Sequence, residues 1–529
     1  MLLVLSCAHK KALDPAVDEI YSYCNCPPPQ YAVRVQISGL NGSVQLKLND
    51  FTPVAIIQNG TFTFSPKLDD GSLYNITIVQ QPAGQTCTLN PDRGILLGAN
   101  AQVSLICSAS VYTVGGSITG LTNSLVLTLN EVESKTMSSN GTFVFNTPLP
   151  DGASYEIGIL TQPLNQICAV TNRRGNIAGS NVTNVAISCS NLSSTMPRYT
   201  TPPQGADLSI TYLQANVGNV DLTCATQAYS KLCFQDVEDR IQSNIAIHNP
   251  DIITLQEVFP DWLCREGKAA GNNQVCQNYQ IRNVRDQVRR LLGTNYTVVC
   301  DPAHGWDCIA IKQSIGNFLP DSKGRLCPPS YLCGTTTFSN GDPTATNKDP
   351  KFAYFEATYS SSSYDGGFHM LYVDAIIHGR QIRIINGHPQ SGGTGSGSKE
   401  SARQIQIHDA FTNWTFQRTF LSCDCNLDPY REFSDISVVE WKQHVDAYDS
   451  SGNRISTNPF YYHSGVAETG YLWPPQLTAV YLAPLPSHTY DHVVSNFAYG
   501  NCQTLDGINR LDGGSGMDHK ALLCTLYFF

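Results

Sequence analysis

A repeat with an offset of 81 residues, from Asn59 to Asn140, constrains the N-terminal part of the chain more than any other feature. Residues 59–89 read NGTFTFSPKLDDGSLYNITIVQQPAGQTCTL, and residues 140–170 read NGTFVFNTPLPDGASYEIGILTQPLNQICAV. The copies share the NGTF segment, a DG turn, a QP pair and a cysteine. Self-similarity at a fixed period indicates that one folding unit occurs twice in succession.

Alternation of apolar and polar residues predicts half-buried β-strands in both copies. It is clear in VQLKLN, TFTF and LVLTLN. Each copy closes with a second cysteine, Cys107 after Cys87 and Cys189 after Cys168. The simplest interpretation is two β-sandwich modules of about 80 residues, each with one internal disulfide. The modules resemble the tandem immunoglobulin-like modules of bacterial surface proteins, which implies spacers or adhesive modules that bind cell-surface ligands.

Shifts in composition divide the chain into five segments. We expect an N-terminal segment at 1–27, β modules at 28–110 and 111–190, a linker at 191–207 and a further domain at 208–529. The linker lies in SNLSSTMPRYTTPPQGAD, which is rich in Ser, Thr and Pro. Beyond it, helical patterns and apolar strands alternate, which indicates an α/β domain. The predicted protein is therefore multidomain, with two all-β sandwich modules followed by an α/β domain.

Composition favours an oxidising compartment and disfavours a general nucleic-acid-binding surface. The chain has 529 residues, 19 cysteines and a formal net charge of −10. Cysteines spread in this way are typical of a disulfide framework. An acidic chain lacks the excess of Lys and Arg that displaces counterions from DNA, although a bound divalent cation can supply positive charge locally. Spacing alone does not settle which cysteines are bonded to each other. The cysteines that lie close together in the sequence form the candidate pairs Cys224/Cys233, Cys264/Cys276, Cys300/Cys308, Cys327/Cys333 and Cys502/Cys524.

The first residues predict a lipid anchor. Val4-Leu5-Ser6-Cys7 resembles a bacterial lipobox, in which the cysteine becomes the lipidated N-terminus. If Cys7 carries lipid, 18 cysteines remain, an even number that can pair completely. The alternative is a frayed apolar N-terminus, since this start is short for a signal peptide. We expect an extracellular or outer-membrane-anchored bacterial lipoprotein, and the sequence has no run of about 20 apolar residues that would span a membrane.

Five patches beyond residue 208 place polar residues beside apolar strands, where active sites are commonly built. In each patch we expect an apolar strand to present its polar residue to a loop, and we expect the apolar strand after His519 to anchor that residue. Turns, a strand cap or a satisfied loop histidine are the ordinary explanations. These ordinary explanations fit Glu257 least well, because a carboxylate beside an apolar strand needs a partner or a metal. In order, the patches are LSITYLQANVGN with Asn216, NPDIITLQEVF with Glu257, RQIRIINGHPQSGG with His388, FLSCDCNLDPY with Asp424 and Asn426, and TYDHVVSN with Asp491 paired with GMDHKALL, which holds Asp518 and His519.

In this order the patches resemble the endonuclease/exonuclease/phosphatase superfamily, which includes pancreatic-type deoxyribonuclease, abasic-site endonucleases and bacterial sphingomyelinases. The resemblance covers residues 208–529 and implies a four-layer α/β sandwich, in which two packed β-sheets are flanked by helices. Cys423 replaces the Gly of the family's GDxN motif, and Met517 replaces the Ser of its SDH motif. A disulfide at Cys423 or Cys425 would alter the local geometry. The matching residues are Asn216, Gln256-Glu257, Gly387-His388, Asp424 with Asn426, Tyr490-Asp491-His492 and Met517-Asp518-His519.

The resemblance implies catalytic roles for five residues. His519 is the expected general base, and Asp491 would hold its imidazole in the right tautomer. His388 would bind a phosphoryl oxygen or protonate the leaving group. Asp424 and Asn426 would orient the water and the phosphate.

A metal site is implied beside these residues. Glu257 supplies a hard oxygen ligand that suits Mg²⁺, with Mn²⁺, Ca²⁺ or Co²⁺ as alternatives. Asn216 would help to place the metal or the phosphate, and Asp518 would bind the metal directly or through water. A zinc site is not indicated, because the sequence lacks paired CxxC or HxxxH spacings.

The substrate is indicated only in part. QEVFPDW and HPQSGG are similar to the glutamate and histidine segments of bacterial sphingomyelinases. The aromatic stretch YLWPPQLTAVYLAPLP at 471–486 suits a membrane surface, or else a core or covered loop. These features and the acidic charge favour a monomeric phosphodiesterase of the phospholipase C or sphingomyelinase type. A secreted nuclease acting on nucleic acid is the first alternative, and a catalytically inactive adhesin is the second.

Overall fold

The structure is a computed structural model that falls into two compact units. The first contains Met1–Ser117, Thr142–Ile157 and Asn172–Ala186, and the second contains Ile118–Gly141, Gly158–Thr171 and Ile187–Phe529. Because this division passes through the second repeat, the predicted domain boundaries stay a prediction. The described residues are 27–163, 166–191, 202–203, 205–218, 235–258, 287–300, 307–334, 352–363, 368–392, 397–429, 434–446, 458–465, 490–505 and 519–529.

The first β module is a sandwich of two four-stranded sheets that share one core. Its strands alternate as predicted, because every second side chain of β2 and β3 is buried. The Cys87–Cys107 disulfide joins two directly opposed residues of β8 and β10. One sheet has the order β5 (Gly60–Thr63), β2 (Val33–Ser38), β10 (Ala101–Ala109), β8 (Gln85–Asn90), and the other β4 (Val54–Ile56), β3 (Val44–Leu48), β7 (Leu73–Gln80), β9 (Arg93–Ile95), while β1 (Gln30–Tyr31) pairs with β6 (Leu68–Asp69).

The second β module repeats this arrangement of sheets. The Cys168–Cys189 disulfide again joins the strands that end the copy. The prediction of two all-β modules is confirmed, and their likeness to immunoglobulin modules stays a prediction. Its sheets have the orders β15 (Gly141–Val144), β12 (Val114–Thr119), β20 (Val182–Asn191), β18 (Gln166–Thr171) and β14 (Glu133–Met137), β13 (Leu125–Leu129), β17 (Ser154–Thr161), β19 (Arg174–Asn176), while β11 (Val111–Tyr112) pairs with β16 (Leu149–Pro150).

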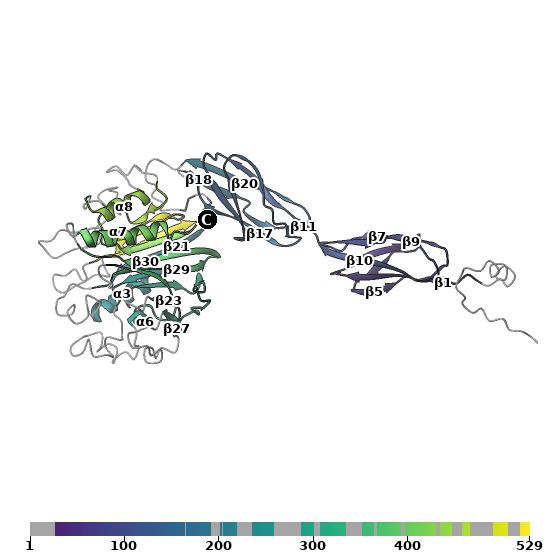
Figure 1. Ribbon diagram of the computed structural model, residues 1–529, viewed down its shortest axis with the longest axis horizontal. Helices are drawn as coiled ribbons and strands as arrows, with labels where there is room; N and C mark the ends of the chain where they lie inside the picture. Colours follow the sequence, from purple (N-terminus) through teal and green to yellow (C-terminus); the bar gives the residue numbers. More distant parts are fainter. Residues whose placement is uncertain are drawn as a thin grey trace, which may run out of the picture. The chain divides into compact units, whose positions relative to one another are not determined.

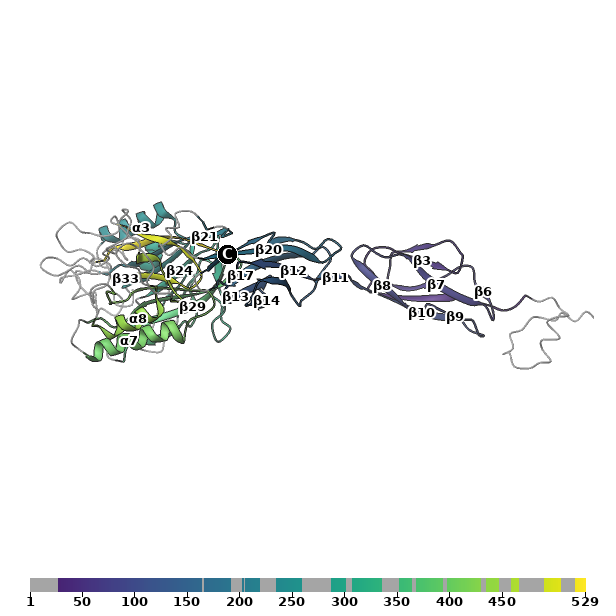
Figure 2. The same ribbon diagram turned by 90° about the horizontal axis from the view of Figure 1, so that it is seen from above.

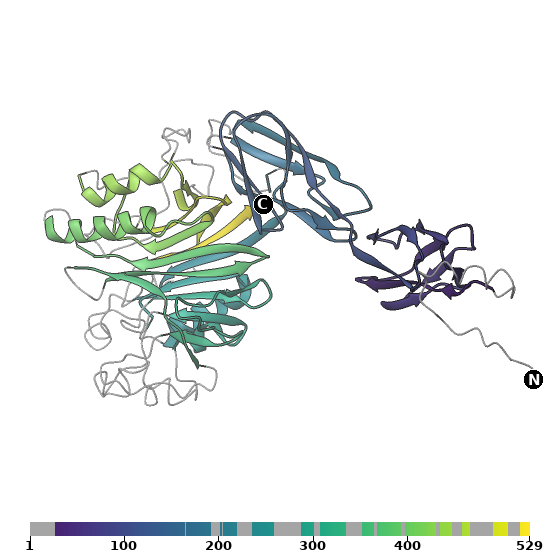
Figure 3. The ribbon, with the colours of Figure 1, turned by 45° about the vertical axis from the view of Figure 1, so that its right-hand side comes forward.

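Two large sheets, called sheet I and sheet II, form the centre of the C-terminal part (Figure 3). Buried apolar residues of both sheets belong to one core, so the sheets pack face to face. Sheet I has the order β27 (Phe352–Tyr354), β26 (Leu332–Gly334), β23 (Tyr296–Cys300), β24 (Cys308–Lys312), β22 (Ile252–Gln256), β21 (Leu208–Asn216), β35 (Ala521–Phe528), β34 (Tyr499–Leu505). Sheet II has the order β25 (Gly316–Phe318), β29 (His369–Ile377), β30 (Arg380–His388), β31 (Thr419–Asp424), β33 (Asp491–Ser495), β32 (Tyr461–Tyr462), with β28 (Thr358–Ser361) also paired to β29, and a short 3-10 helix η1 (His463–Gly465) follows β32.

Helices cover both outer faces of this pair of sheets (Figure 1). Helices α3 (Gln235–His248) and α6 (Gln287–Leu292) share a core with sheet I. Helices α7 (Gly397–Thr412) and α8 (Ile436–His444) share a core with sheet II and lie side by side (Figures 1 and 2). The four-layer α/β sandwich is therefore confirmed. No helix in the described ranges has the length and apolar character needed to cross a membrane.

Disulfides follow the close spacings of the sequence wherever the structure describes both cysteines. Three of the predicted close pairs are formed in the C-terminal part, Cys300–Cys308, Cys327–Cys333 and Cys502–Cys524. The pairs Cys224/Cys233 and Cys264/Cys276, together with Cys7, lie outside the described residues.

A buried ion pair ties the β13–β14 turn to sheet II within the second unit. Glu131 Oε2 accepts a hydrogen bond from Arg418 Nη1 at 2.6 Å, and Oε1 accepts one from Nη2 at 3.2 Å. Arg380 Nε lies 3.5 Å from the same carboxylate. Arg418 is 1% exposed and directly precedes β31, so this turn supports the strand that ends in Asp424.

We predict that Glu131→Ala lowers the free energy of unfolding of the second unit by about 3–5 kcal/mol, because it leaves the guanidinium of Arg418 buried without its carboxylate. Urea denaturation measures the change. Asp50→Ala is the matched control, since Asp50 occupies the same place in the first repeat but is fully exposed beside Lys47 at 3.7 Å. The control should behave like the wild type, and equal behaviour of both variants would contradict the support by this ion pair.

Candidate active site

Polar residues gather at one edge of the two packed sheets. Asn216 ends β21, and Glu257 directly follows β22. His388 ends β30, and Asp424 ends β31. Because β21 is parallel to β22 and β30 is parallel to β31, the carboxyl ends of each pair point the same way. The prediction that an apolar strand presents its polar residue to a loop is confirmed for these four.

Two further residues reach this edge from the opposite direction. Asp491 is the first residue of β33, and His519 precedes β35. The prediction that an apolar strand follows and anchors His519 is confirmed, and both residues lie at the beginning of a strand and not at its end. The reason is strand direction: β33 is antiparallel to β31 with Asp491 opposite Asp424, and β35 is antiparallel to β21. An antiparallel strand begins at the edge where its neighbour ends.

Asp424 lies at the centre of the cluster and contacts several of its other members. Its Oδ2 accepts a hydrogen bond from Asn216 Nδ2 at 2.8 Å. The same oxygen lies 3.4 Å from His388 Nε2 and 3.5 Å from His519 Nε2. Its Oδ1 accepts a hydrogen bond from the backbone N–H of Asn426 at 3.1 Å. Two imidazoles from different sheets thus converge on one buried oxygen.

Burial sets the charge of this carboxyl group. Desolvation raises the pKa of Asp424 to about 7, and the negative charges of Asp491 and Glu257 act in the same direction. Interactions with His519 and Asn216 oppose the rise in pKa. In the absence of a bound cation, Asp424 therefore changes its protonation state near neutral pH.

His519 is held from one side by a buried carboxylate. Its Nδ1 lies 2.6 Å from Asp491 Oδ2. Gln214 Nε2 donates a hydrogen bond to the other oxygen, Asp491 Oδ1, at 2.9 Å. Asp491 is fully buried, and His519 is 6% exposed. An ionised carboxylate at Nδ1 favours the tautomer that leaves Nε2 free of a proton, and Nε2 is the atom that faces Asp424.

His388 connects the carboxylates of Glu257 and Asp424. Its Nδ1 lies 3.5 Å from Glu257 Oε1, while its Nε2 faces Asp424. Glu257 has a φ of 58°, a left-handed conformation that is uncommon for a residue with a side chain and recurs at functional sites. Asn426 Nδ2 donates to the Pro389 carbonyl at 2.9 Å, which fastens the loop after His388 to the loop after Asp424.

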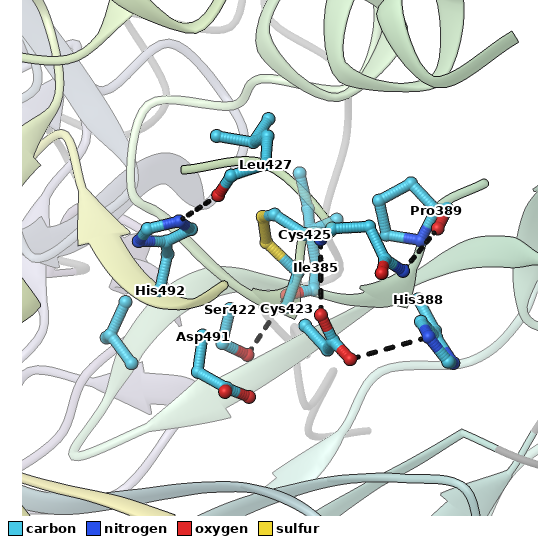
Figure 4. The surroundings of a disulfide bond; sticks show 12 residues. Ile385, His388, Pro389, Ser422, Cys423, Cys425, Leu427, Asp491 and His492 are labelled. Atoms are coloured by element: carbon cyan, nitrogen blue, oxygen red, sulfur yellow. Dashed lines mark hydrogen bonds and ion pairs between the residues drawn. A yellow bond between two sulfur atoms is a disulfide. The ribbon is translucent and has the colours of Figure 1, made fainter. Parts of the chain in front are cut away.

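A disulfide joins the two residues that flank Asp424 in the sequence. In the view of Figure 4 the two bonded cysteines lie between His388 and His492. Cys423 and Cys425 are bonded to each other, and both are fully buried. A bridge that closes so short a loop removes little chain entropy from the unfolded state, so its effect is local. It restricts the backbone on both sides of the central carboxylate.

A layer of hydrogen-bonded polar side chains, which the sequence did not predict, lies between the two sheets next to these residues. Gln256 Nε2 donates to Asn386 Oδ1 at 2.6 Å, and Gln214 Nε2 donates to Gln256 Oε1 at 2.9 Å. The Tyr212 hydroxyl lies 2.8 Å from Ser422 Oγ. Strand residues that are two positions apart share a face of the sheet, so a polar residue two positions before a predicted site residue indicates a member of this layer. Members that lie two residues before a predicted site residue are Gln214, Asn386 and Ser422.

Some predicted features lie outside the described residues. These are Asp518, Cys7 and the aromatic stretch at 471–486. Of the predicted catalytic and metal-binding set, the structure brings together Asn216, Glu257, His388, Asp424, Asn426, Asp491 and His519.

Comparisons with known proteins give similarity only among solved structures. No protein-family model matches the sequence, and no curated protein matches it. D. rerio TDP2 complexed with a single-strand DNA product has 12% identity and a TM-score of 0.36 over 60% of this chain and 99% of that one. An endonuclease/exonuclease/phosphatase family protein of Bacteroides thetaiotaomicron has 11% identity and a TM-score of 0.35 over 61% and 96%. The mannosyl-6-phosphatase of the same organism has 11% and 0.35 over 60% and 100%.

We predict that Gln214→Met lowers the free energy of unfolding by about 1–3 kcal/mol, because Asp491 Oδ1 and Gln256 Oε1 both lose a buried donor. Urea denaturation of the second unit measures the change. The matched control is Gln503→Met, an exposed glutamine of β34 in the same sheet. An unchanged midpoint for Gln214→Met would show that the polar layer does not stabilise the fold.

Proposed function

We propose that residues 208–529 form a divalent-cation-dependent phosphodiesterase of the endonuclease/exonuclease/phosphatase superfamily. One observation carries the proposal: His519, paired with buried Asp491 at 2.6 Å, and His388 both face a single carboxylate oxygen of Asp424. Hydrolysis of a phosphodiester needs a base for water and an acid for the leaving oxygen. Two imidazoles that converge from different strands supply that pair.

The proton transfers follow from this geometry. His519 Nε2 takes a proton from the attacking water while the water oxygen bonds to phosphorus. Asp491 stabilises the resulting imidazolium through Nδ1. The bond from phosphorus to the leaving oxygen breaks, and protonated His388 donates its proton to that oxygen. Asp424 and Asn426 orient the water and the phosphate between them.

The donor set fits a hard divalent cation. Glu257 offers a carboxylate that is 13% exposed, and the side-chain oxygen of Asn216 lies at the same edge, where it accepts from the N–H of Gly218 at 2.9 Å. Oxygen donors of this kind suit Mg²⁺, with Mn²⁺, Ca²⁺ or Co²⁺ as alternatives. Glu257 and Asn216 would hold the ion, with Asp518 as a further ligand. The ion supplies positive charge against the anionic phosphate.

Within this class we favour a phospholipase C or sphingomyelinase-like activity. The support is the sequence of the Glu257 and His388 segments, the acidic net charge and the aromatic stretch at 471–486. A nuclease is the alternative, and an inactive adhesin is the alternative from another class. Convergence of the polar residues on Asp424 argues against the adhesin, since a binding head has no need of a carboxylate-held histidine.

The remaining proposals concern the setting of the enzyme. Lipidation at Cys7 would place it on the outer surface of a bacterium. There the two β modules would act as spacers or would bind cell-surface ligands, and the domain at 208–529 would meet lipid at the membrane surface. We propose that the protein acts as a monomer.

We predict that His519→Gln lowers kcat by about 10²–10⁴ without unfolding the protein, because the general base is lost. Asp491→Asn should act similarly, since it favours the wrong imidazole tautomer. Initial rates on bis(p-nitrophenyl) phosphate with Mg²⁺ measure both effects, and circular dichroism checks folding. His378→Asn, at an exposed β29–β30 turn, is the control that should retain full activity. Full activity of folded His519→Gln would remove His519 as the base.

A second experiment tests the substrate class. Sphingomyelin vesicles, phosphatidylcholine vesicles and plasmid DNA are each incubated with the protein and Mg²⁺, with and without EDTA. We expect phosphocholine release that EDTA abolishes. Nicked plasmid beside intact vesicles would replace the lipid assignment with a nuclease, and a folded protein that is silent on all three substrates and on the small phosphodiester would contradict the enzyme.

A further inference from the structure

A second group of metal-ligating side chains lies on helices α7 and α8, which carry none of the site residues described above. It consists of His408, Glu440 and His444, called here the helix triad. Each residue offers one ligand atom, and these atoms all lie within 4.8 Å of one another. His408 Nδ1 lies 2.8 Å from Glu440 Oε1, and His444 Nε2 lies 3.0 Å from the same oxygen.

The packing of the two helices produces this convergence. Glu440 and His444 are four residues apart on α8, so they share one helix face. Arg403 in the middle of α7 contacts Asp435 and Ser437 at the start of α8. The two helices therefore run in the same direction, and His408, five residues beyond Arg403, meets the last turns of α8.

The donor set matches a transition-metal ion. Two imidazole nitrogens and one carboxylate oxygen are the ligands of the His₂Glu class of zinc sites, with bonds of about 2.0–2.2 Å. Tetrahedral bonds of that length place the donor atoms about 3.3 Å apart. The two separations between a histidine nitrogen and Glu440 Oε1 are 2.8 and 3.0 Å, and the two histidine nitrogens lie within 4.8 Å of each other. Binding of an ion would move the carboxylate oxygen slightly away from both rings and bring the ring nitrogens to tetrahedral spacing. Mg²⁺ prefers oxygen donors and does not suit this set.

The surroundings hold the ligands in place. Phe411 stacks on the His444 ring with centroids 5.0 Å apart and an interplanar angle of 15°. The side chains of Glu440 and His444 are 9% and 18% exposed, whereas that of His408 is 52% exposed. The site is thus supported from within and open to solvent on one side.

We propose that His408, Glu440 and His444 bind a first-row divalent transition-metal ion such as Zn²⁺, with water as the fourth ligand. The ion fastens the C-terminal part of α7 to that of α8, as the Arg403 contacts fasten the middle of α7 to the start of α8. Each histidine binds through the nitrogen that now faces Glu440, and its remaining ring proton sits on the other nitrogen. Because Arg403 also donates to the carbonyl of Gln390, α7 supports the loop that follows His388.

Calorimetric titration of Zn²⁺ into the EDTA-treated and dialysed full chain tests the proposal. Four proteins are compared: wild type, His408→Ala/His444→Ala, Glu257→Gln and His248→Ala, a control histidine at the end of α3. We expect wild type, Glu257→Gln and His248→Ala to share one Zn²⁺ site that an excess of Mg²⁺ does not displace. The double variant should lose that site or bind it more than about tenfold more weakly. Equal Zn²⁺ affinity and stoichiometry in the wild type and the double variant would overturn the proposal.

Thermal unfolding of His408→Ala gives an independent readout. This single change removes a half-exposed ligand and spares the buried ones, so the variant should fold. Zn²⁺ should raise the Tm of the wild type through binding to the native state. It should raise the Tm of His408→Ala much less. An equal rise in both proteins would place the bound Zn²⁺ elsewhere and contradict the assignment.

Discussion

Hydrogen bonds between the two packed sheets, at one edge of the sandwich, are the interaction on which the rest of the site depends. Asn216 of sheet I binds Asp424 of sheet II, and Gln214 of sheet I binds Asp491 of sheet II. His519, which precedes a strand of sheet I, also binds Asp491. Polar groups buried this deeply must be paired, so the sheets can pack only in the register that satisfies them. The same bonds that fix the packing also position the imidazole.

The outer layers and the second β module reinforce this edge. Arg418, which precedes β31, is held by Glu131 from the β13–β14 turn, and Cys423 and Cys425 restrict the far end of the same strand. On the other side, Arg403 of α7 donates to the backbone after His388. The strand ends that carry Asp424 and His388 are thus fixed by groups that take no part in the proposed chemistry, as a preorganised site requires.

Much of this arrangement could be predicted from the sequence because it rests on local patterns. Alternation identified the strands of the β modules, and close spacing identified several disulfides. Apolar strands with polar ends identified Glu257, His388 and Asp424. Strand direction was not predictable in this way, since an apolar run reads the same in either direction. The sequence therefore did not show that β33 and β35 begin at the edge where β31 and β21 end.

Long-range features escaped the sequence for a different reason. The polar layer that includes Gln214 and Asn386 exists only when the two sheets face each other, and the helix triad exists only when α7 lies beside α8. Each residue alone looks like an ordinary strand amide or a surface histidine. Their partners are far away in the chain, so neither spacing nor periodicity reveals the contact.

The most direct test of the central claim is the position of Mn²⁺ in crystals of the protein soaked with Mn²⁺ and phosphate, located by anomalous scattering. The account predicts a peak in contact with the carboxylate of Glu257, with phosphate bound between His388 and His519. Absence of a peak at Glu257 from crystals that bind Mn²⁺ elsewhere would contradict the account, because the edge of the two sheets would then not be the metal centre.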